Sequence, residues 1–407
     1  MNPEQERRWG VNRLPPIRFV LAFGVVSGLG DIVYEGARSV VGPFMAGFGA
    51  SAALVGLVTG LGEAMALVFR LFSGRLSDRT GRQWAISISG YAVTMVAVPL
   101  LAVAGNVWAA SALVIAERFG KGLRTPARDT MLAQAGTDLG RGWTFAVHEA
   151  LDQVGAFIGP LAVAAFLEVS RGYRDGFAAL AIPGAAALAV LAWLRARVPS
   201  PRDYAARENS KPVNTLELHG FSRRFWQYSA FSAATMAGFA TFAVLAYHLD
   251  KAKVVSVPMI PIMYAAAMAM AAIASLVSGR MYDRIGLRGL GVLPLLGAAV
   301  PFFAFAQSAA FVWVGTLLWG LAMGIHESTM RAAVGDMVAP ERRGAGYGTF
   351  TAVYGLAWLA GAALTGVFYD MAIHWAIAFN VGMQAIALLL FLPLLSSRHP
   401  GSAVASE

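Results

Sequence analysis

The sequence predicts an all-α membrane protein in which twelve transmembrane helices form two pseudo-symmetric bundles of six. Hydrophobic residues make up 57% of the 407 residues, so roughly 230 side chains need an apolar environment. Charged residues make up 14%, whereas a soluble domain carries roughly 25%. A loop that recurs in the second half of the chain indicates an internal duplication. Together these observations exclude a water-soluble enzyme.

The apolar stretches, separated by glycine, proline or charged residues, predict twelve spans. A spanning helix needs about 20 apolar residues, and each stretch is close to that length or longer. They fall at approximately 17–48, 51–74, 84–105, 107–131, 144–169, 174–198, 225–250, 256–282, 288–306, 309–336, 342–370 and 373–396.

A long polar stretch between the sixth and seventh spans predicts a linker between two halves. The expected organisation is an N-terminal tail (1–16), a six-helix bundle (17–198), a cytoplasmic linker (199–224), a second six-helix bundle (225–396) and a C-terminal tail (397–407).

Basic residues predict the orientation, because Lys and Arg are enriched in cytoplasmic loops. Of the 32 Lys and Arg residues, we assign four to the outside, five to the spans and the remaining 23 to the inside. Both termini are therefore expected in the cytoplasm of a multi-pass protein of the cell membrane, and the net charge of +9 reflects these loops rather than nucleic-acid binding. The chain has no cysteine, which excludes disulfides, thiolate metal sites and cysteine nucleophiles.

The repeated loop follows spans two and eight, and its acidic residue recurs 205 positions later. The two copies contain Gly74, Asp78, Arg79, Gly81 and Arg82 in the first and Asp283 and Arg284 in the second. Gly74 and Gly81 are expected to allow a tight turn. The charged residues can interact with neighbouring helix ends and form a cytoplasmic gate. The alternative is a positive loop that only fixes the topology.

Three short patterns resemble those of the major facilitator superfamily, and in particular its twelve-helix proton-coupled antiporters. Residues 74–82, GRLSDRTGR, fit the loop signature G-x-L-a-D-r-x-G-r. Residues 118–122, RFGKG, resemble R-x-x-q-G, with Lys121 where glutamine is usual. Residues 155–160, GAFIGP, resemble the antiporter signature g-x-x-x-G-P, but residues 161–164 lack the glycine pair that normally follows.

This resemblance covers essentially the whole chain and implies a transporter that works by alternating access. It implies a latch in which Asp78 faces the start of span eleven and Asp129 faces Arg79 or Arg82. It also implies that Arg118 takes part in proton coupling.

The glycines of span five predict close helix packing. Gly155 and Gly159 lie four residues apart on one helix face, and small residues at that spacing let two backbones approach. Pro160 removes one backbone hydrogen bond and can kink the span. This motif predicts either a tight interface between the two halves or ordinary packing of membrane helices.

Span one carries Asp31, Glu35 and Arg38 at positions i, i+4 and i+7, which lie along one helical stripe. A charge at the bilayer centre costs at least ~2.5 kcal/mol, so this stripe is expected to face an internal cavity. One acid can pair with Arg38, which leaves the other to take up a proton. The alternative is a fully compensated structural ion network.

Other charges within spans are further candidates for the central cavity. Arg118 lies near the midplane of span four, where its permanent charge can hold a carboxylate ionised; alternatively it is only a counter-ion for Glu117 or Asp31. The remaining candidates are Lys121, Glu149 and Asp152. Glu63 and Arg70 share a face of span two, but the sequence does not decide whether they line the path.

Two His-Glu pairs predict a polar ring at the inner mouth of the cavity. Its residues are His148 with Glu149, and His326 and Glu327 with Arg331. Neighbouring residues point to different helix faces, and HExxH spacing is absent from the sequence, so neither a metal nor a cofactor is expected. Tyr34, Tyr354 and Trp358 are the best candidates for contact with an apolar substrate.

The sequence therefore favours proton-driven export of small organic molecules, with Asp31 or Glu35 as the proton site and Arg118 as its counter-charge. An importer or uniporter of a polar or anionic molecule is the alternative, because Arg38, Arg118, Lys121 and Arg331 add positive charge to the path. A sensor or scaffold that transports nothing represents another class. No catalytic residues are expected, and the expected partners are lipid, substrate and protons, with the monomer as the functional unit.

Overall fold

The computed structural model describes residues 14–396 except for 138, 171, 205–220 and 339–341. Within these ranges the chain is helical and contains no strand. The first half comprises α2 (Pro16–Arg38), α3 (Val41–Gly47), α4 (Ala52–Thr80), α5 (Gln83–Leu100), α6 (Val107–Ala135), α7 (Arg141–Ser170), α8 (Tyr173–Ala179) and α9 (Ala181–Arg197). The second half comprises α10 (Arg223–Ala237), α11 (Phe242–Lys251), α12 (Met259–Ile285), α13 (Val292–Ala304), α14 (Ala309–Glu327), α15 (Thr329–Met337), α16 (Arg343–Met371) and α17 (Ile373–Ser396).

Ten helical segments of the described chain are long and apolar enough to cross a membrane. One of them, Met259–Ala304, contains both α12 and α13. The charged helix α6 is not among the ten, although its 29 residues are long enough to span. The arrangement is therefore consistent with the twelve expected spans. Several of these are broken rather than continuous, as at residues 39–40 between α2 and α3.

Local sequence explains where many helices begin. Ser51, Asn106 and Ser222 precede α4, α6 and α10, and each side chain accepts a hydrogen bond from a backbone N–H of the first turn at 2.9–3.2 Å. Such caps satisfy donors that have no partner within the helix. Pro16 starts α2, where its missing N–H costs nothing.

The repeated loop has the same backbone feature in both halves. Gly81, which directly follows α4, has a φ of 65°, and Gly286, which directly follows α12, has a φ of 61°. Only glycine adopts such positive φ values at little cost. Gly74 differs from the expectation, because α4 continues to Thr80 and keeps Gly74 inside the helix, where it faces Pro126 of α6. The tight turn therefore depends on Gly81 and not on Gly74.

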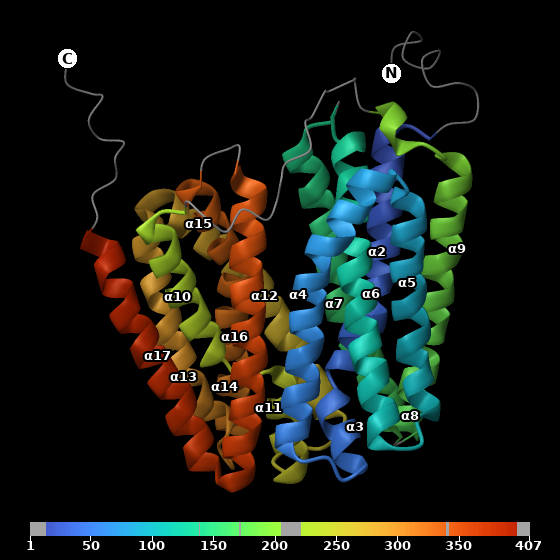
Figure 1. Cartoon of the computed structure of the whole chain (residues 1–407). Coiled ribbons are helices and arrows are strands. Elements are labelled where there is room, and N and C mark those ends of the chain that lie inside the picture. The colour runs from blue at the N-terminus through green and yellow to red at the C-terminus, as the bar shows by residue number, and fades with distance from the viewer. Residues whose placement is uncertain (1–13, 138, 171, 205–220, 339–341, 397–407) are drawn as a thin grey trace, which may run out of the picture.

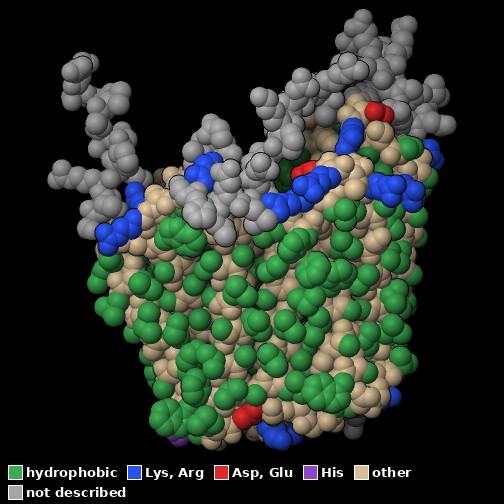
Figure 2. Space-filling model, in the orientation of Figure 1, with side chains coloured by type: hydrophobic (Ala, Val, Ile, Leu, Met, Phe, Trp, Pro, Cys, Tyr) green, Lys and Arg blue, Asp and Glu red, His purple; other side chains and the backbone are tan. Residues whose placement is uncertain are grey.

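The two halves stand side by side, and the start of α2 and the end of α17 lie at the same end of the molecule (Figure 1). We call this end the terminus side and the opposite end the far side. Hydrophobic side chains cover the flank of the molecule, whereas Lys and Arg gather on the terminus side (Figure 2). This distribution fits a protein immersed in lipid.

The halves meet closely on the far side. A Cβ added to Gly42 of α3 would collide with the backbone of Ala243 in α11, and one on Gly366 of α16 would collide with that of Ala52 in α4. Asp370 of α16 also accepts hydrogen bonds from the backbone N–H groups of Ala52 (2.9 Å) and Ala53 (2.8 Å). An acceptor from the second half thus caps the N-terminus of a first-half helix.

The glycine motif of α7 lies within the first half. Added Cβ atoms on Gly155 and Gly159 would collide with the backbone carbonyls of Gly28 and Ile32 in α2. The expected interface between the halves is therefore wrong for these glycines, and the alternative of close helix packing describes them. Pro160 follows within the same continuous helix.

Candidate functional site

A cavity of about 810 Å³ lies between the two halves. Residues of α2, α4, α6 and α7 form one wall, and residues of α12, α14 and α16 form the other. The cavity extends from Glu35 in the middle of the fold to Phe145 and Tyr347, near the terminus-side ends of α7 and α16. Together with the close contacts on the far side, this geometry describes a chamber that opens toward the terminus side.

Buried ion pairs connect three helices of the first half. Arg38 contacts Glu35 at 3.4 Å and Glu63 at 3.1 Å. Arg118 contacts Glu63 at 3.5 Å and Glu117 at 3.1 Å. Three carboxylates from α2, α4 and α6 therefore share two guanidinium groups, which offsets the cost of placing each charge in a low-dielectric interior.

The second half contributes one hydrogen bond to this network. The hydroxyl of Tyr264 on α12 donates to Oε2 of Glu35. Glu35 is thereby held by an arginine of its own helix and by a tyrosine of the other half. Sequence reasoning missed Tyr264, because tyrosine in a membrane span is most often an interfacial anchor. The charge of Glu63 within a span was a signal for this site, but the sequence did not decide whether Glu63 lines the path.

Asp31 differs from the other acids of the first-half wall. It lines the cavity and is only 7% exposed, yet no ion pair or hydrogen bond to its side chain is found among the described residues. Charged groups that act on it electrostatically are Lys121, Arg124, Glu35 and Asp152. The structure thus separates the two acids of span one: Glu35 is paired, and Asp31 is not.

Lys121 has a neutral partner. Its Nζ donates to the hydroxyl of Tyr34 at 2.7 Å and lies 4.1 Å from the centre of the Tyr34 ring. The guanidinium groups of Arg118 and Arg124 lie 5.4 and 5.6 Å from the same ring centre. Tyr34 therefore concentrates three cations around one aromatic side chain, which sequence reasoning had assigned only to apolar substrate contact.

A second polar cluster lies closer to the terminus side. His148 hydrogen-bonds with Ser27 at 2.8 Å and approaches Asp152 at 3.5 Å, and Arg128 approaches Asp152 at 3.7 Å. His148 is buried, whereas its neighbour Glu149 is exposed, as expected for adjacent residues on one helix. Both line the cavity.

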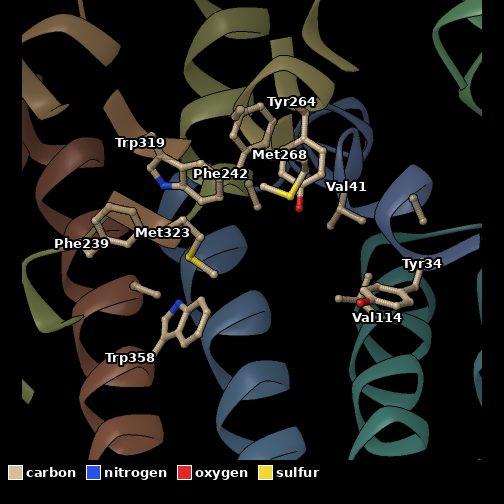
Figure 3. Packing of buried hydrophobic residues seen from close by; sticks show 14 of the residues in the cluster. Tyr34, Val41, Val114, Phe239, Phe242, Tyr264, Met268, Trp319, Met323 and Trp358 are labelled. Atoms are coloured by element: carbon tan, nitrogen blue, oxygen red, sulfur yellow. The ribbon is translucent and has the colours of Figure 1, made fainter. Parts of the chain in front are cut away.

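Aromatic and methionine side chains dominate the second-half wall. Tyr354 forms a T-shaped pair with Trp358 at 6.1 Å and stacks on Phe350 at 5.9 Å. Met268 and Met323 also line this wall. In Figure 3 these methionines and Trp358 face Tyr34 and Val114 of the first half across an open space.

His326 and Glu327 also line the cavity. His326 is buried and hydrogen-bonds through Nδ1 with the Tyr354 hydroxyl at 3.0 Å. The side chain of Arg331 lies outside the described residues, so the expected pairing with Glu327 is not placed. The two histidines are thus buried in opposite walls instead of standing at the rim.

The expected gate residues lie on the terminus side and are apart. Asp129 pairs with Arg128 at 2.9 Å, and within the described ranges no ion pair joins it to Arg79 or Arg82. Asp78 is exposed, and the Arg202 guanidinium lies against the neighbouring Gly81. Asp283 and Arg284 of the second copy are likewise exposed. Asp78 and the start of α16 belong to different halves, which the cavity mouth separates at this end. Asp129, Arg79 and Arg82 all belong to the first half, where Asp129 is held by Arg128.

The chain is similar to a known protein family in sequence and to a solved transporter in fold. A family model described as Major Facilitator Superfamily matches residues 23–250 and 229–407. An uncharacterized protein of Mycobacterium tuberculosis is 48% identical over 382 residues, which is 93% of each chain. The class E tetracycline resistance protein of Escherichia coli is 29% identical over 132 residues, 32% of each chain. The crystal structure of nucleoside transporter NupG shares the fold, with a TM-score of 0.74, 14% identity, and coverage of 93% of this chain and 100% of that one.

Proposed function

This chain belongs to the major facilitator superfamily and is a membrane transporter rather than an enzyme, and from that premise we propose that it exports small organic molecules in exchange for protons. Transport proceeds by alternating access: the two halves rock about the cavity, which opens first to one side of the membrane and then to the other.

The observation that supports this proposal is that Asp31 has no ion-pair or hydrogen-bond partner among the described residues. In the first half, Glu35, Glu63 and Glu117 are neutralised by arginines, whereas Asp31 lines the cavity and is buried without a partner among the described residues. An unpaired acid inside a membrane protein marks an ion or proton path by default. We assign the proton to Asp31 rather than to Glu35, whose carboxylate already holds Arg38 and Tyr264.

Coupling requires that a proton and the substrate bias the same equilibrium in opposite directions. A proton on Asp31 removes the negative charge that a polar or basic substrate group would contact. Arg118 serves as the fixed counter-charge of the network, with Glu117 as its partner. Asp152, His148 and Glu149 form the terminus-side path along which the proton leaves the cavity.

The second-half wall supports an organic, partly apolar substrate. Met268, Met323, Tyr354 and Trp358 offer polarizable and aromatic surface that adapts to different shapes. The resemblance of a third of the chain to a tetracycline resistance protein supports an organic compound as the substrate.

The terminus side is assigned to the cytoplasm of a cell-membrane protein, because Lys and Arg gather there (Figure 2). On this assignment the structure is inward-open. When this side closes, Asp78 meets the start of α16, Asp129 meets Arg79 or Arg82, and the Asp283 copy forms its counterpart in the second half. Because the cavity and both gates are formed by one chain, the monomer is the working unit.

Transport by purified protein in vesicles tests this proposal. We expect uphill accumulation of at least one member of a compound panel that includes tetracycline, with protons moving in the opposite direction. Asp31→Asn is expected to lower the accumulation ratio to about 1, since an uncoupled carrier only equilibrates its substrate. The exposed Glu168→Gln is the matched control and should accumulate substrate like the parent protein. Compound and proton moving in the same direction would contradict export by exchange.

One observation favours a second candidate, an importer or uniporter of a polar or anionic molecule. Lys121 and Arg124 are cations of the cavity wall, and their hydrogen-bond partners among the described residues, Tyr34 and Thr94, are neutral. Either cation can therefore bind an anion. The same vesicles decide between the two: movement of an anionic nucleotide or peptide with protons, or without them, would replace the export assignment. A sensor that transports nothing would show no movement of any compound and no effect of Asp31→Asn.

A further inference from the structure

Two opposite charges face one cavity without forming an ion pair. Asp31 on α2 and Lys121 on α6 both line it, and they act on one another electrostatically. Nevertheless no ion pair joins them among the described residues, so the Lys121 nitrogen lies more than 4.0 Å from the Asp31 oxygens. Lysine has four rotatable side-chain bonds, so something must hold its ammonium group away from the acid.

Tyr34 is placed to do so. It lies three residues after Asp31 on α2 and is 5% exposed. Its hydroxyl accepts a hydrogen bond from the Lys121 ammonium group at 2.7 Å, and its ring centre lies 4.1 Å from the same nitrogen. The ring is itself confined by Arg118 and Arg124 at 5.4 and 5.6 Å. A neutral phenol thus binds a cation that would otherwise be attracted to the neighbouring carboxylate.

We propose that Tyr34 is a positioning residue that keeps Lys121 off Asp31, so that the Asp31 carboxylate stays available to a proton. This inference rests on the proposed function, in which Asp31 is the proton site. Without the hydroxyl of Tyr34, Lys121 turns to Asp31, pairs with it and holds it ionised. The coupling acid is then neutralised in the same way as Glu35 and Glu63.

The other groups that face Asp31 do not perform this role. Arg124 of α6 is anchored by Thr94 at 2.9 Å and by the ring of Tyr91 at 4.5 Å. Asp152 of α7 carries the same charge sign as Asp31 and contacts His148 and Arg128. Glu35 on α2 itself is tied to Arg38 and Tyr264. Lys121 is therefore the cation whose hydroxyl partner lies on α2, three residues from Asp31.

Infrared titration of the purified protein tests this inference without a substrate. The measured quantity is the carbonyl stretch of the protonated carboxyl group, and the Asp31 band is the one that Asp31→Asn removes. Tyr34→Phe keeps the ring and removes the hydroxyl. It should lower the proton affinity of Asp31 by at least about tenfold, because an opposite charge within ~4–6 Å favours the ionised form. Tyr228→Phe, which removes a buried tyrosine hydroxyl in the second half, should leave the band unchanged.

A second substitution shows whether Tyr34 acts through Lys121. Lys121→Gln should raise the proton affinity of Asp31, and adding Tyr34→Phe to it should cause no further change. An Asp31 band that Tyr34→Phe does not move, or moves equally in the Lys121→Gln background, would overturn this inference alone. If no titrating band disappears in Asp31→Asn, the proposed proton site fails together with it.

Discussion

The two walls of the cavity differ in chemistry although the halves share one architecture. The first-half wall carries acids, arginines and a lysine, including Asp31, Arg38, Glu63 and Lys121. An ion pair joins Arg38 to Glu63, and Tyr34 binds Lys121. The second-half wall carries Met268, Met323, Phe350, Tyr354 and Trp358. The two halves thus share their helix arrangement and the Gly81 and Gly286 turns but differ in the residues that face the cavity. On the proposed function, the first half handles charge, and the second half offers apolar surface to a substrate.

The far side and the terminus side differ in a second way. On the far side, glycine contacts and the Asp370 cap hold α4 and α16 together. On the terminus side, the cavity opens between the two halves. A transporter of this kind needs closures of comparable and modest strength at its two ends, because a ligand shifts an equilibrium only by its differential affinity for the two states.

The largest effect is expected in the ion network of the first-half wall. Glu63→Gln leaves Arg38 and Arg118 without their shared carboxylate, and removing one partner of a buried ion pair costs about 3–5 kcal/mol. Chemical denaturation in detergent should show this loss in the free energy of unfolding. The exposed Glu168→Gln is the control and should change it by less than about 0.5 kcal/mol. Equal stability of the two variants would show that the network is not structural.

An intermediate effect is expected in the second-half wall. Trp358 is 6% exposed, and its Nε1 has no hydrogen-bond partner within the described structure. Full burial of a large apolar side chain is worth about 1.5–3 kcal/mol. Because Trp358 is already largely buried, a substrate gains only part of this from it, and Trp358→Ala should weaken substrate binding by roughly tenfold. Calorimetry with the transported compound measures this affinity. The proton titration of Asp31 should stay unchanged, and so should the affinity in Trp375→Ala, which alters an exposed tryptophan of α17.

If Trp358→Ala shifted the Asp31 titration while leaving the affinity intact, the division of tasks between the walls would be wrong.

The smallest effect is expected at the far-side closure. Asp370→Ala removes the acceptor for two backbone N–H groups at the start of α4, and loss of a helix cap costs about 0.5–2 kcal/mol. The ratio of far-side-open to far-side-closed molecules should therefore rise roughly 2-fold to 30-fold. Distances between spin labels across the far side measure this ratio. Asp370→Asn retains one carbonyl acceptor and should have a smaller effect, so an equal response to both variants would argue against capping.

Much of the cavity could be predicted from the sequence, because charges inside spans cannot face lipid. Asp31, Glu35 and Arg38 lie on one stripe, and all three line the cavity. The pairing within that stripe was not predictable: the arginine that neutralises Glu35 also binds Glu63 of another helix, and that contact depends on how helices pack.

Other features of the structure could not be predicted from the sequence, for related reasons. Gly155 and Gly159 indicated a close approach of two backbones but not which helix would approach, and the partner is α2 of the same half. Gly74 looked like a turn residue because charged residues follow it, yet α4 continues beyond it. The contacts that the resemblance implies for the loop signature are not formed among the described residues, where Asp129 pairs with Arg128 instead.

The most direct test is to measure both ends of the molecule in one titration. The chain has no cysteine, so spin labels can be placed on Thr80→Cys and Ile285→Cys at the terminus side, and on Gly47→Cys and Lys251→Cys at the far side. On acidification we expect the two distances to change in opposite directions, and Asp31→Asn to abolish both changes. Distances that stay fixed, that change in the same direction, or that still respond in Asp31→Asn would contradict proton-driven alternation of the two halves.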